Sequence, residues 1–269
     1  MTTMTYPLRD SRTMLRRNVR RMLRYPSLTV MLVGLPVVFL LLFVFVFGGT
    51  LGSGLGGPAA GLTGRAAYAN YVVPGILLMT IAGAVQGTAI SIAMDMTEGI
   101  VARFRTMSIS RASVLTGHVI GSLIQVFVGL VSVTAVALAV GFRPGAGVGG
   151  WLGAIGLLVL AGLAMIWLAV ALGLKAKSVE TASNTPMILM LLPFLSSGFV
   201  PTDSMPTLLR WFAEYQPFTP VIETLRALLS GTPVGTTGVV AVGWCVVIAG
   251  AGYLWSRRLY ERASIRPRG

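Results

Sequence analysis

The stretch LLPFLSSGFVPTDSMPTLLRWFAEYQPFTPVIETLRALLSG, which runs from Leu191 to Gly231, decides the fold of this chain. Five prolines interrupt it, and because proline lacks the backbone N–H that a helix interior needs, one continuous helix is excluded. A serine or threonine stands shortly before two of these prolines, an order typical of helix beginnings, and Gly231 is a typical stop. The stretch therefore predicts two short helices, Pro206 to Tyr215 and Pro220 to Leu229.

Both predicted short helices are amphipathic. Two helices that dip back into the outer membrane leaflet explain this mixture better than a solvated loop, and a helix lying flat at the outer interface is the alternative. Glu223 and Arg226 are three residues apart and can pair on the second helix. The apolar positions are Leu208, Leu209, Trp211, Phe212 and Tyr215 in the first helix and Val221, Leu225, Leu228 and Leu229 in the second.

The rest of the chain has the composition of an integral membrane protein. Of 269 residues, 55% are hydrophobic and 11% are charged, and the mean hydropathy is +0.81; ordinary soluble domains do not reach these values. Charge-free runs of about 20 residues can cross a hydrocarbon core as helices, and they lack the alternation of barrel strands. We predict one all-α transmembrane domain, residues 1–269, with six spans, of which the fifth is short and interrupted by Pro186, Pro193 and Gly198. These spans are Leu28–Phe47, Tyr71–Met94, Val114–Val140, Gly149–Leu172, Thr185–Val200 and Gly238–Trp255.

The cationic residues indicate the orientation of the chain. Lys and Arg are retained on the cytoplasmic side of short loops. With the N-terminus inside, only Arg65, Arg143, Arg210 and Arg226 of the 21 Lys and Arg residues fall in outer segments. We therefore expect a multi-pass protein of the bacterial cytoplasmic membrane with both termini cytoplasmic. Topology accounts for the net charge of +13, so a nucleic-acid partner is not predicted.

A basic segment precedes the first span. Residues 10–24 place Leu15, Val19 and Leu23 on one helical face and arginines around the other. This pattern predicts an amphipathic helix in the inner interface, attracted to anionic lipid, and disordered positive-inside charge is the alternative. The central arginines of this interface helix are Arg16, Arg17, Arg20 and Arg21.

The segment DMTEGIVARFRTMSISR, Asp95 to Arg111, lies between the second and third spans. Asp95 and Glu98 have capping-box spacing, which predicts that a new helix begins at Asp95. An apolar stripe of Ile100, Phe104 and Met107 then recurs at helical spacing. Periodicity leaves open whether this stripe lies against lipid or docks into a groove of another protein.

The chain carries no recognisable energy source of its own. Apart from His118 near the inner start of the third span, the predicted spans contain no ionisable residue of the kind that ion-coupled carriers use. The sequence GLKAKS at Gly173–Ser178 lacks the second glycine of a phosphate-binding loop. The single cysteine, Cys245, excludes an intramolecular disulfide, and a lone histidine, His118, is more often an interfacial polar residue than a ligand. We predict no catalytic residue and no metal site; if the protein moves a compound uphill, a separate chain must supply the energy.

Two stretches of the sequence resemble the type-2 ABC exporter permeases, in particular their drug-resistance branch. They are EGIVARFRTMSISRASVLTGHVIG after the second span and LLPFLSSGFVPTDSMPTLLRWFAEYQPFTPVIETLRALLSG before the sixth, and they accompany the Arg-rich helix before the first span. The resemblance implies a half-transporter, in which two permease chains, here a homodimer, bind two ATP-binding subunits that hold ATP and Mg. It also implies that residues 98–110 form the coupling helix, that 9–24 form an interface helix beside it, and that 204–230 are re-entrant outer helices. The chain departs from the family pattern at Ser108, where members often have proline.

These observations predict a permease subunit that exports a hydrophobic drug-like or lipidic compound. Alternatives are a lipid or polysaccharide exporter on the same fold and an ion-coupled carrier. The residues expected to couple to the ATPase are Glu98, Ile100, Arg103, Phe104, Arg105 and Met107. Those expected along the substrate path are Phe43, Gln86, Phe194, Ser196 and Ser197, although bonding between helices is the commoner role for a buried amide such as Gln86.

Overall fold

The computed structural model describes residues 26–54, 64–97 and 111–263. Every regular element in these residues is helical, as the composition predicts. Both segments predicted to contact the ATPase, residues 10–24 and 98–110, lie outside them. The elements in chain order are α2 (Pro26–Leu42), the π-helical turn η1 (Phe43–Phe47), α3 (Gly48–Gly54), α4 (Gly64–Thr97), α6 (Arg111–Ala139), α7 (Val148–Lys175), α8 (Val179–Asn184), α9 (Met187–Leu191), the 3-10 turn η2 (Thr202–Ser204), α10 (Thr207–Tyr215), α11 (Phe218–Ser230) and α12 (Thr237–Ala263).

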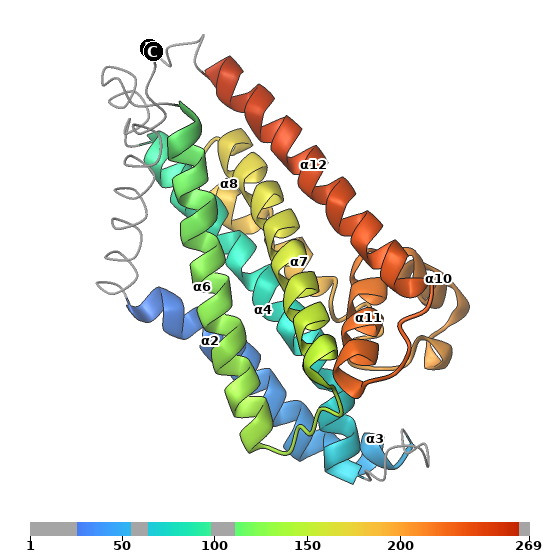
Figure 1. The fold of residues 1–269 in the computed structure, drawn as a ribbon. Helices are drawn as coiled ribbons and strands as arrows, with labels where there is room; N and C mark the ends of the chain where they lie inside the picture. Colours follow the sequence, from blue (N-terminus) through green and yellow to red (C-terminus); the bar gives the residue numbers. More distant parts are fainter. Residues whose placement is uncertain (1–25, 55–63, 98–110, 264–269) are drawn as a thin grey trace.

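Long apolar helices dominate the molecule (Figure 1). Within the described residues, five are long and apolar enough to cross a membrane, so the six helical spans of the prediction are not confirmed. The difference is the fifth predicted span, 185–200, which forms only the five-residue helix α9 and then turns. Pro186 and Pro193 explain the break, because neither can donate the backbone hydrogen bond that would continue the helix. The five helices correspond to Leu32–Ser53, Gly64–Thr97, Gly117–Ala139, Val148–Lys175 and Thr237–Glu261.

Helix α4 occupies the centre of the bundle. It packs against α2, α6, α7, α8, α9 and α11, and 72% of its most apolar window is buried. Helix α12 is much less buried, since only 17% of its most apolar window is buried. Within the described residues, it packs mainly on α7 and α11. A polar side chain on α4 is therefore costly unless it has a hydrogen-bond partner.

Two predicted boundaries need correction. The first span does not end at Phe47, because the chain continues through η1 into α3 and reaches Gly54. The second helix does not end at Met94, because α4 continues through Asp95 to Thr97. Asp95 is a buried residue inside this helix, so the prediction that it begins a separate helix is wrong.

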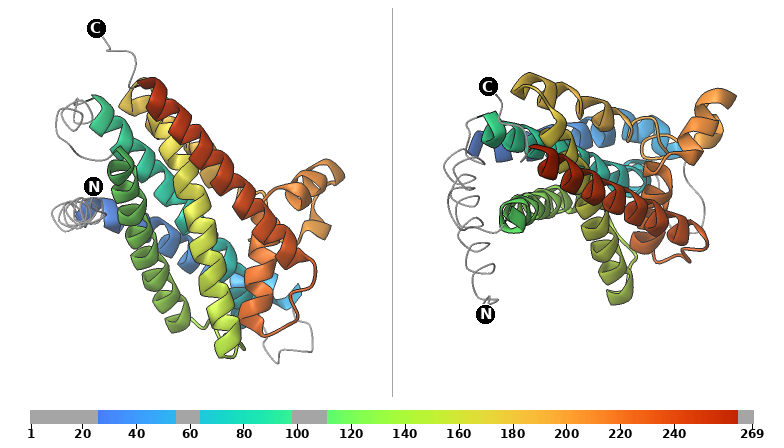
Figure 2. Two further views of the ribbon diagram at one scale, coloured as in Figure 1. Left: turned by 45° about the horizontal axis from the view of Figure 1, so that its top comes forward. Right: turned by 90° about the horizontal axis from the view of Figure 1, so that it is seen from above.

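The two short outer helices form close to their predicted positions. Helix α11 ends at Gly231, whose φ of 73° is left-handed and whose N–H is directed at the carbonyls of Ala227 and Leu228. A glycine stop of this kind satisfies carbonyls that the helix end leaves open. Helix α10 projects from the side of the bundle, whereas α11 stands within it (Figure 2).

Candidate functional site

The broken segment between α8 and η2 returns the chain along α4. Just before this segment, Gln86 Nε2 donates to the carbonyl and hydroxyl oxygens of Ser183 in α8, both at 3.1 Å. The end of the segment is held where the Tyr68 hydroxyl donates to the carbonyl of Phe199 at 3.2 Å. Tyr68 and Gln86 are 18 residues apart on one helix, or about 27 Å at 1.5 Å per residue. The segment therefore follows α4 in antiparallel direction over nearly the thickness of a hydrocarbon core, although it is not a continuous helix.

A contact between two glycines lets the broken segment approach α4 so closely. A Cβ added to Gly75 would lie 2.8 Å from the carbonyl oxygen of Gly198 and 2.9 Å from its Cα. No larger residue fits there without moving one backbone away from the other. The small residues thus set the distance at which side chains of α4 reach carbonyls of the segment.

Arg226 on α11 joins α4 and the broken segment. Its Nη2 donates to the carbonyl of Ser197 at 2.7 Å and to that of Tyr71 at 3.3 Å. The guanidinium carbon also lies 3.9 Å from the centre of the Tyr71 ring, and the Tyr71 hydroxyl donates to the same Ser197 carbonyl at 2.9 Å. The predicted ion pair between Arg226 and Glu223 is not formed in the structure, because the guanidinium donates to backbone carbonyls instead. A broken helix leaves backbone carbonyls without their helical hydrogen-bond partners. Arg226 donates to one such carbonyl, that of Ser197.

The two serines predicted on the substrate path are buried in the turn. Ser196 is 0% exposed; its hydroxyl donates to the Pro193 carbonyl at 2.5 Å and accepts from the Gly198 N–H at 3.1 Å. Ser197 is 2% exposed, and its N–H donates to Thr219 Oγ1 at 3.2 Å. The Ser196 hydroxyl therefore holds the local backbone, whereas the Ser197 hydroxyl is buried without a hydrogen-bond partner among the described residues.

The two phenylalanines predicted on the path do come together, through a third. Phe43 and Phe194 each lie 4.7 Å from the ring centre of Phe199, and Phe39 lies 5.2 Å from Phe194. We call these four rings the aromatic cluster; it joins the first span to the broken segment. Phe39, Phe43 and Phe194 are half-buried, so apolar surface remains open beside them. Sequence reasoning missed Phe39 and Phe199, although the four-residue spacing of Phe39, Phe43 and Phe47 was a usable signal.

Gln86 has the structural role that is commoner for a buried amide. Its two bonds to Ser183 connect α4 with α8. The amide NH₂ group is thereby engaged, whereas the amide oxygen can still accept a hydrogen bond. Of the five predicted path residues, Phe43, Gln86 and Phe194 are half-buried, whereas Ser196 and Ser197 are buried.

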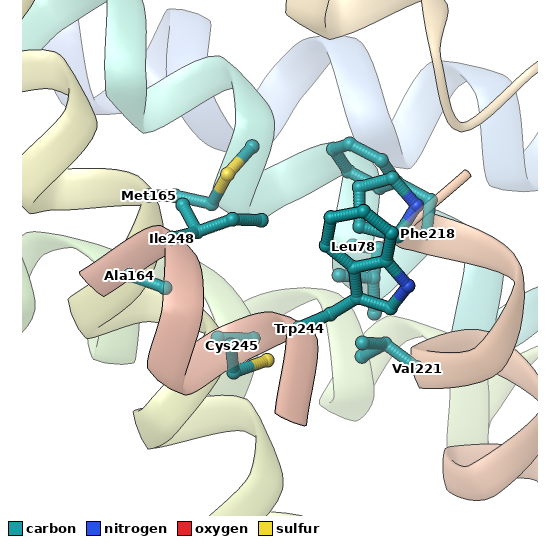
Figure 3. A pocket seen from close by; sticks show the side chains of 10 residues that line it. Leu78, Ala164, Met165, Phe218, Val221, Trp244, Cys245 and Ile248 are labelled. Atoms are coloured by element: carbon teal, nitrogen blue, oxygen red, sulfur yellow. The ribbon is translucent and has the colours of Figure 1, made fainter. Parts of the chain in front are cut away.

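An apolar cavity lies between α4, α7, α11 and α12 (Figure 3). Its volume is about 30 Å³, which is close to that of one water molecule. Drug-sized sites need roughly 300 Å³ or more. The cavity is smaller than such a site. Leu78, Met165, Phe218, Val221, Trp244, Cys245 and Ile248 are among its lining residues.

These elements define a class of protein: an all-helical, multi-pass membrane protein whose central helix holds a discontinuous membrane segment, as membrane transporters do. Comparison with known proteins gives the family. The family model described as ABC-2 type transporter matches residues 9–229. The chain therefore belongs to the ABC-2 type transporter family, and the resemblance drawn from its sequence is confirmed.

Relatives in this family are drug-resistance permeases. The chain is 28% identical over 230 residues to the daunorubicin resistance ABC transporter permease protein of Streptomyces coeruleorubidus, which covers 84% of this chain and 78% of the relative. It is 25% identical over 179 residues to a probable doxorubicin resistance ABC transporter permease protein of Mycobacterium tuberculosis, covering 64% of this chain and 65% of the relative. Permeases of this family are transport subunits rather than enzymes, and they work with an ATP-binding subunit.

Proposed function

We propose that this chain is the membrane-spanning subunit of an ABC exporter that moves a hydrophobic drug-like or lipidic compound out of the bacterial cell. Family membership and the drug-resistance relatives support the proposal most strongly. The structure adds that the open surface beside the broken segment is aromatic rather than charged. Such a surface favours flat, apolar ligands through ring stacking and the hydrophobic effect.

Energy reaches the permease through residues 98–110 in this proposal. Ile100, Phe104 and Met107 form the apolar face that enters a cleft of the ATP-binding subunit, and Arg103 and Arg105 pair with acidic groups around that cleft. Glu98 begins the segment, and the helix of Arg16 to Arg21 lies beside it at the inner membrane surface. ATP and Mg bind only to the partner subunit, and its closure moves α4, whose last residue directly precedes the segment.

Transport then changes the exposure of the aromatic cluster. Arg226 and Tyr71 fix the turn around Ser197 to α4, so a displacement of α4 carries Phe194 and Phe199 with it. Phe43 belongs to the first span and does not share this anchor. Movement of the two sides relative to each other would open and close the apolar surface to substrate from the inner leaflet, with both chain termini on the cytoplasmic side.

The exporter contains two copies of this permease in the proposal. The large apolar side chains exposed on α2 and η1, among them Val38, Phe45 and Val46, are surfaces that lipid or a second copy can cover. Two permease chains and two ATP-binding subunits would make a complete exporter. The mass of the complex in lipid nanodiscs measures this directly.

The test is reconstitution of the chain with the ATP-binding subunit encoded beside it. We expect co-purification and ATP hydrolysis that daunorubicin stimulates. Phe104→Asp should abolish this stimulation while the permease still inserts, because a carboxylate cannot enter an apolar cleft without a large desolvation cost. Ser108→Pro, the change toward the family pattern, is the matched control and should keep the stimulation. Unchanged stimulation in Phe104→Asp would remove the coupling role, and transport that collapses with uncouplers but needs no ATP-binding chain would favour a secondary carrier.

A further inference from the structure

Two polar contacts cross the interface between the antiparallel helices α4 and α6. The hydroxyls of Thr88 and Ser122 lie 2.9 Å apart. Seven residues further along α4, the carboxylate of Asp95 lies 3.0 Å from Nε2 of His118. The register agrees, because moving forward along α4 means moving back along α6. The second contact therefore joins the same two helices nearer their ends, by about 10 Å along α4 and about 6 Å along α6.

The Asp95–His118 pair is nearly excluded from solvent. The side chain of His118 is 12% exposed and that of Asp95 is 7% exposed. An ionised carboxylate can only accept hydrogen bonds, so Nε2 of His118 carries the hydrogen of this contact when Asp95 is charged. Asp95 is one of only eight acidic residues in the chain. Burying an ionised carboxylate costs free energy unless a partner is fixed beside it. The pair therefore holds the two helices at one distance and in one register, which apolar side chains sliding over each other would not do.

The position of the pair gives it a use. Asp95 lies two residues before the end of α4, and α6 begins at Arg111, seven residues before His118. The chain between the two helices is 98–110, the segment assigned above to coupling. Figure 1 shows the end of α4 and the beginning of α6 side by side at the same end of the bundle. The pair thus joins the two helices next to the points where that segment leaves and rejoins them.

We propose that Asp95 and His118 are positioning residues that make the ends of α4 and α6 move as one body when the ATP-binding subunit displaces residues 98–110. Without the pair, a push on the segment would part the two helices instead of moving α4 along the broken segment. This inference rests on the proposed function, because it needs a partner that pushes. It assigns no chemistry to the pair beyond the geometry that the pair maintains.

The test replaces both residues together. A single replacement would leave one polar group buried without its partner and would destabilise the helix ends. The double variant Asp95→Leu/His118→Leu fills the same space with apolar groups, so we expect it to insert, bind the ATP-binding subunit and keep basal ATP hydrolysis. Daunorubicin-stimulated hydrolysis should fall about tenfold, which corresponds to roughly 1.4 kcal/mol of lost coupling. Thr88→Val, on the same interface, is the control and should keep the stimulation.

Two further measurements separate this inference from the proposed function. Hydrogen exchange of the backbone at the end of α4 and the start of α6 should be about tenfold faster in the double-leucine variant than in wild type, whatever the chain transports. In a Cys245→Ala background, Asp95→Cys/His118→Cys should lose stimulated hydrolysis and regain it when a short bifunctional thiol reagent joins the two cysteines, because the cross-link again ties the two helix ends together. Wild-type exchange and wild-type stimulation in the double-leucine variant would overturn the inference. A wild-type chain that shows no stimulated hydrolysis with any ATP-binding partner, but shows the exchange difference, would instead overturn the proposed function.

Discussion

Helices α10 and α11 look alike in the sequence and are treated oppositely by the structure. Both are short, amphipathic and introduced by proline. On α11 the apolar residues Val221, Ile222 and Leu225 are buried, and the helix packs against α4, α7 and α12. On α10 the apolar residues Leu208, Trp211 and Tyr215 are 84%, 62% and 65% exposed. The apolar face of α11 therefore belongs to the bundle, whereas that of α10 is left for lipid.

The arginines of the two helices show the same contrast. Arg210 on α10 pairs with Asp203 and Glu214, each at 2.7 Å, and all three side chains are exposed. Arg226 on α11 donates instead to carbonyls of α4 and of the broken segment. Exposed charges on one face and Trp and Tyr on the other are typical of a helix lying at a membrane surface. The comparison teaches that α11 ties the broken segment to the bundle and that α10 is a surface element, and three matched pairs of substitutions test it.

The largest contrast is expected at two leucines. Leu225 is completely buried, so Leu225→Ala should lower the stability by about 2–5 kcal/mol through lost contacts and the space left behind. Leu208→Ala removes the same atoms from an exposed position and should change the stability by less than about 0.5 kcal/mol. Stability can be followed by heating the protein with a thiol-reactive fluorescent maleimide, because the one cysteine, Cys245, is buried and reacts on unfolding. Equal shifts of the melting temperature would show that α11 is not part of the packed bundle.

The two arginines should show the next largest contrast. Arg226→Leu leaves the Ser197 carbonyl with one donor fewer in a buried turn, at a cost of about 1–3 kcal/mol. Arg210→Leu breaks only exposed ion pairs, and salt screens these already. We expect a clearly lower melting temperature for Arg226→Leu and an unchanged one for Arg210→Leu. The reverse order would mean that the anchor of the broken segment lies in the α10 ion pairs.

Two tyrosine hydroxyls should give the smallest contrast. The hydroxyl of Tyr71 donates to Ser197, and Tyr71→Phe should cost about 0.5–1.5 kcal/mol, the usual net value of one hydrogen bond. Tyr215→Phe, on the exposed face of α10, should have no measurable effect on melting. Since Arg226 and Tyr71 donate to the same carbonyl, the double variant Tyr71→Phe/Arg226→Leu should lose more than the sum of the single changes. Strict additivity in this cycle would contradict a shared anchor at Ser197.

Much of this architecture could be predicted from the sequence because its causes are local. Charge-free length predicts the long helices, and Gly231 predicts the end of α11 through its own backbone freedom. Pro186 and Pro193 predict an interrupted fifth span. The interruption is therefore visible in the sequence, and only the extent of the loss of helix is not.

The contacts that define the site could not be predicted in the same way. Arg226 and Tyr71 are 155 residues apart in the chain, and no periodicity brings them together. Asp95 and His118 face each other because two helices pack in one register, whereas local spacing suggested a helix cap at Asp95. The two predicted path serines are buried in a turn, where the Ser196 hydroxyl bonds to backbone groups and the Ser197 N–H donates to Thr219. The aromatic cluster could be predicted only in part. Phe39 and Phe43 are four residues apart on one helix, whereas Phe199 reaches them only through the folding of the chain.

The most direct test of the central claim compares two phenylalanines of one helical turn. Phe43 contacts the aromatic cluster, whereas Phe45 is 51% exposed on the other side of η1. In proteoliposomes that contain the permease and its ATP-binding subunit, we predict ATP-dependent daunorubicin transport. Phe43→Ala should lower it about tenfold, as expected when roughly 1.4 kcal/mol of aromatic contact with substrate is lost, and Phe45→Ala should leave it unchanged. Equal transport by the two variants would contradict a substrate path at the broken segment.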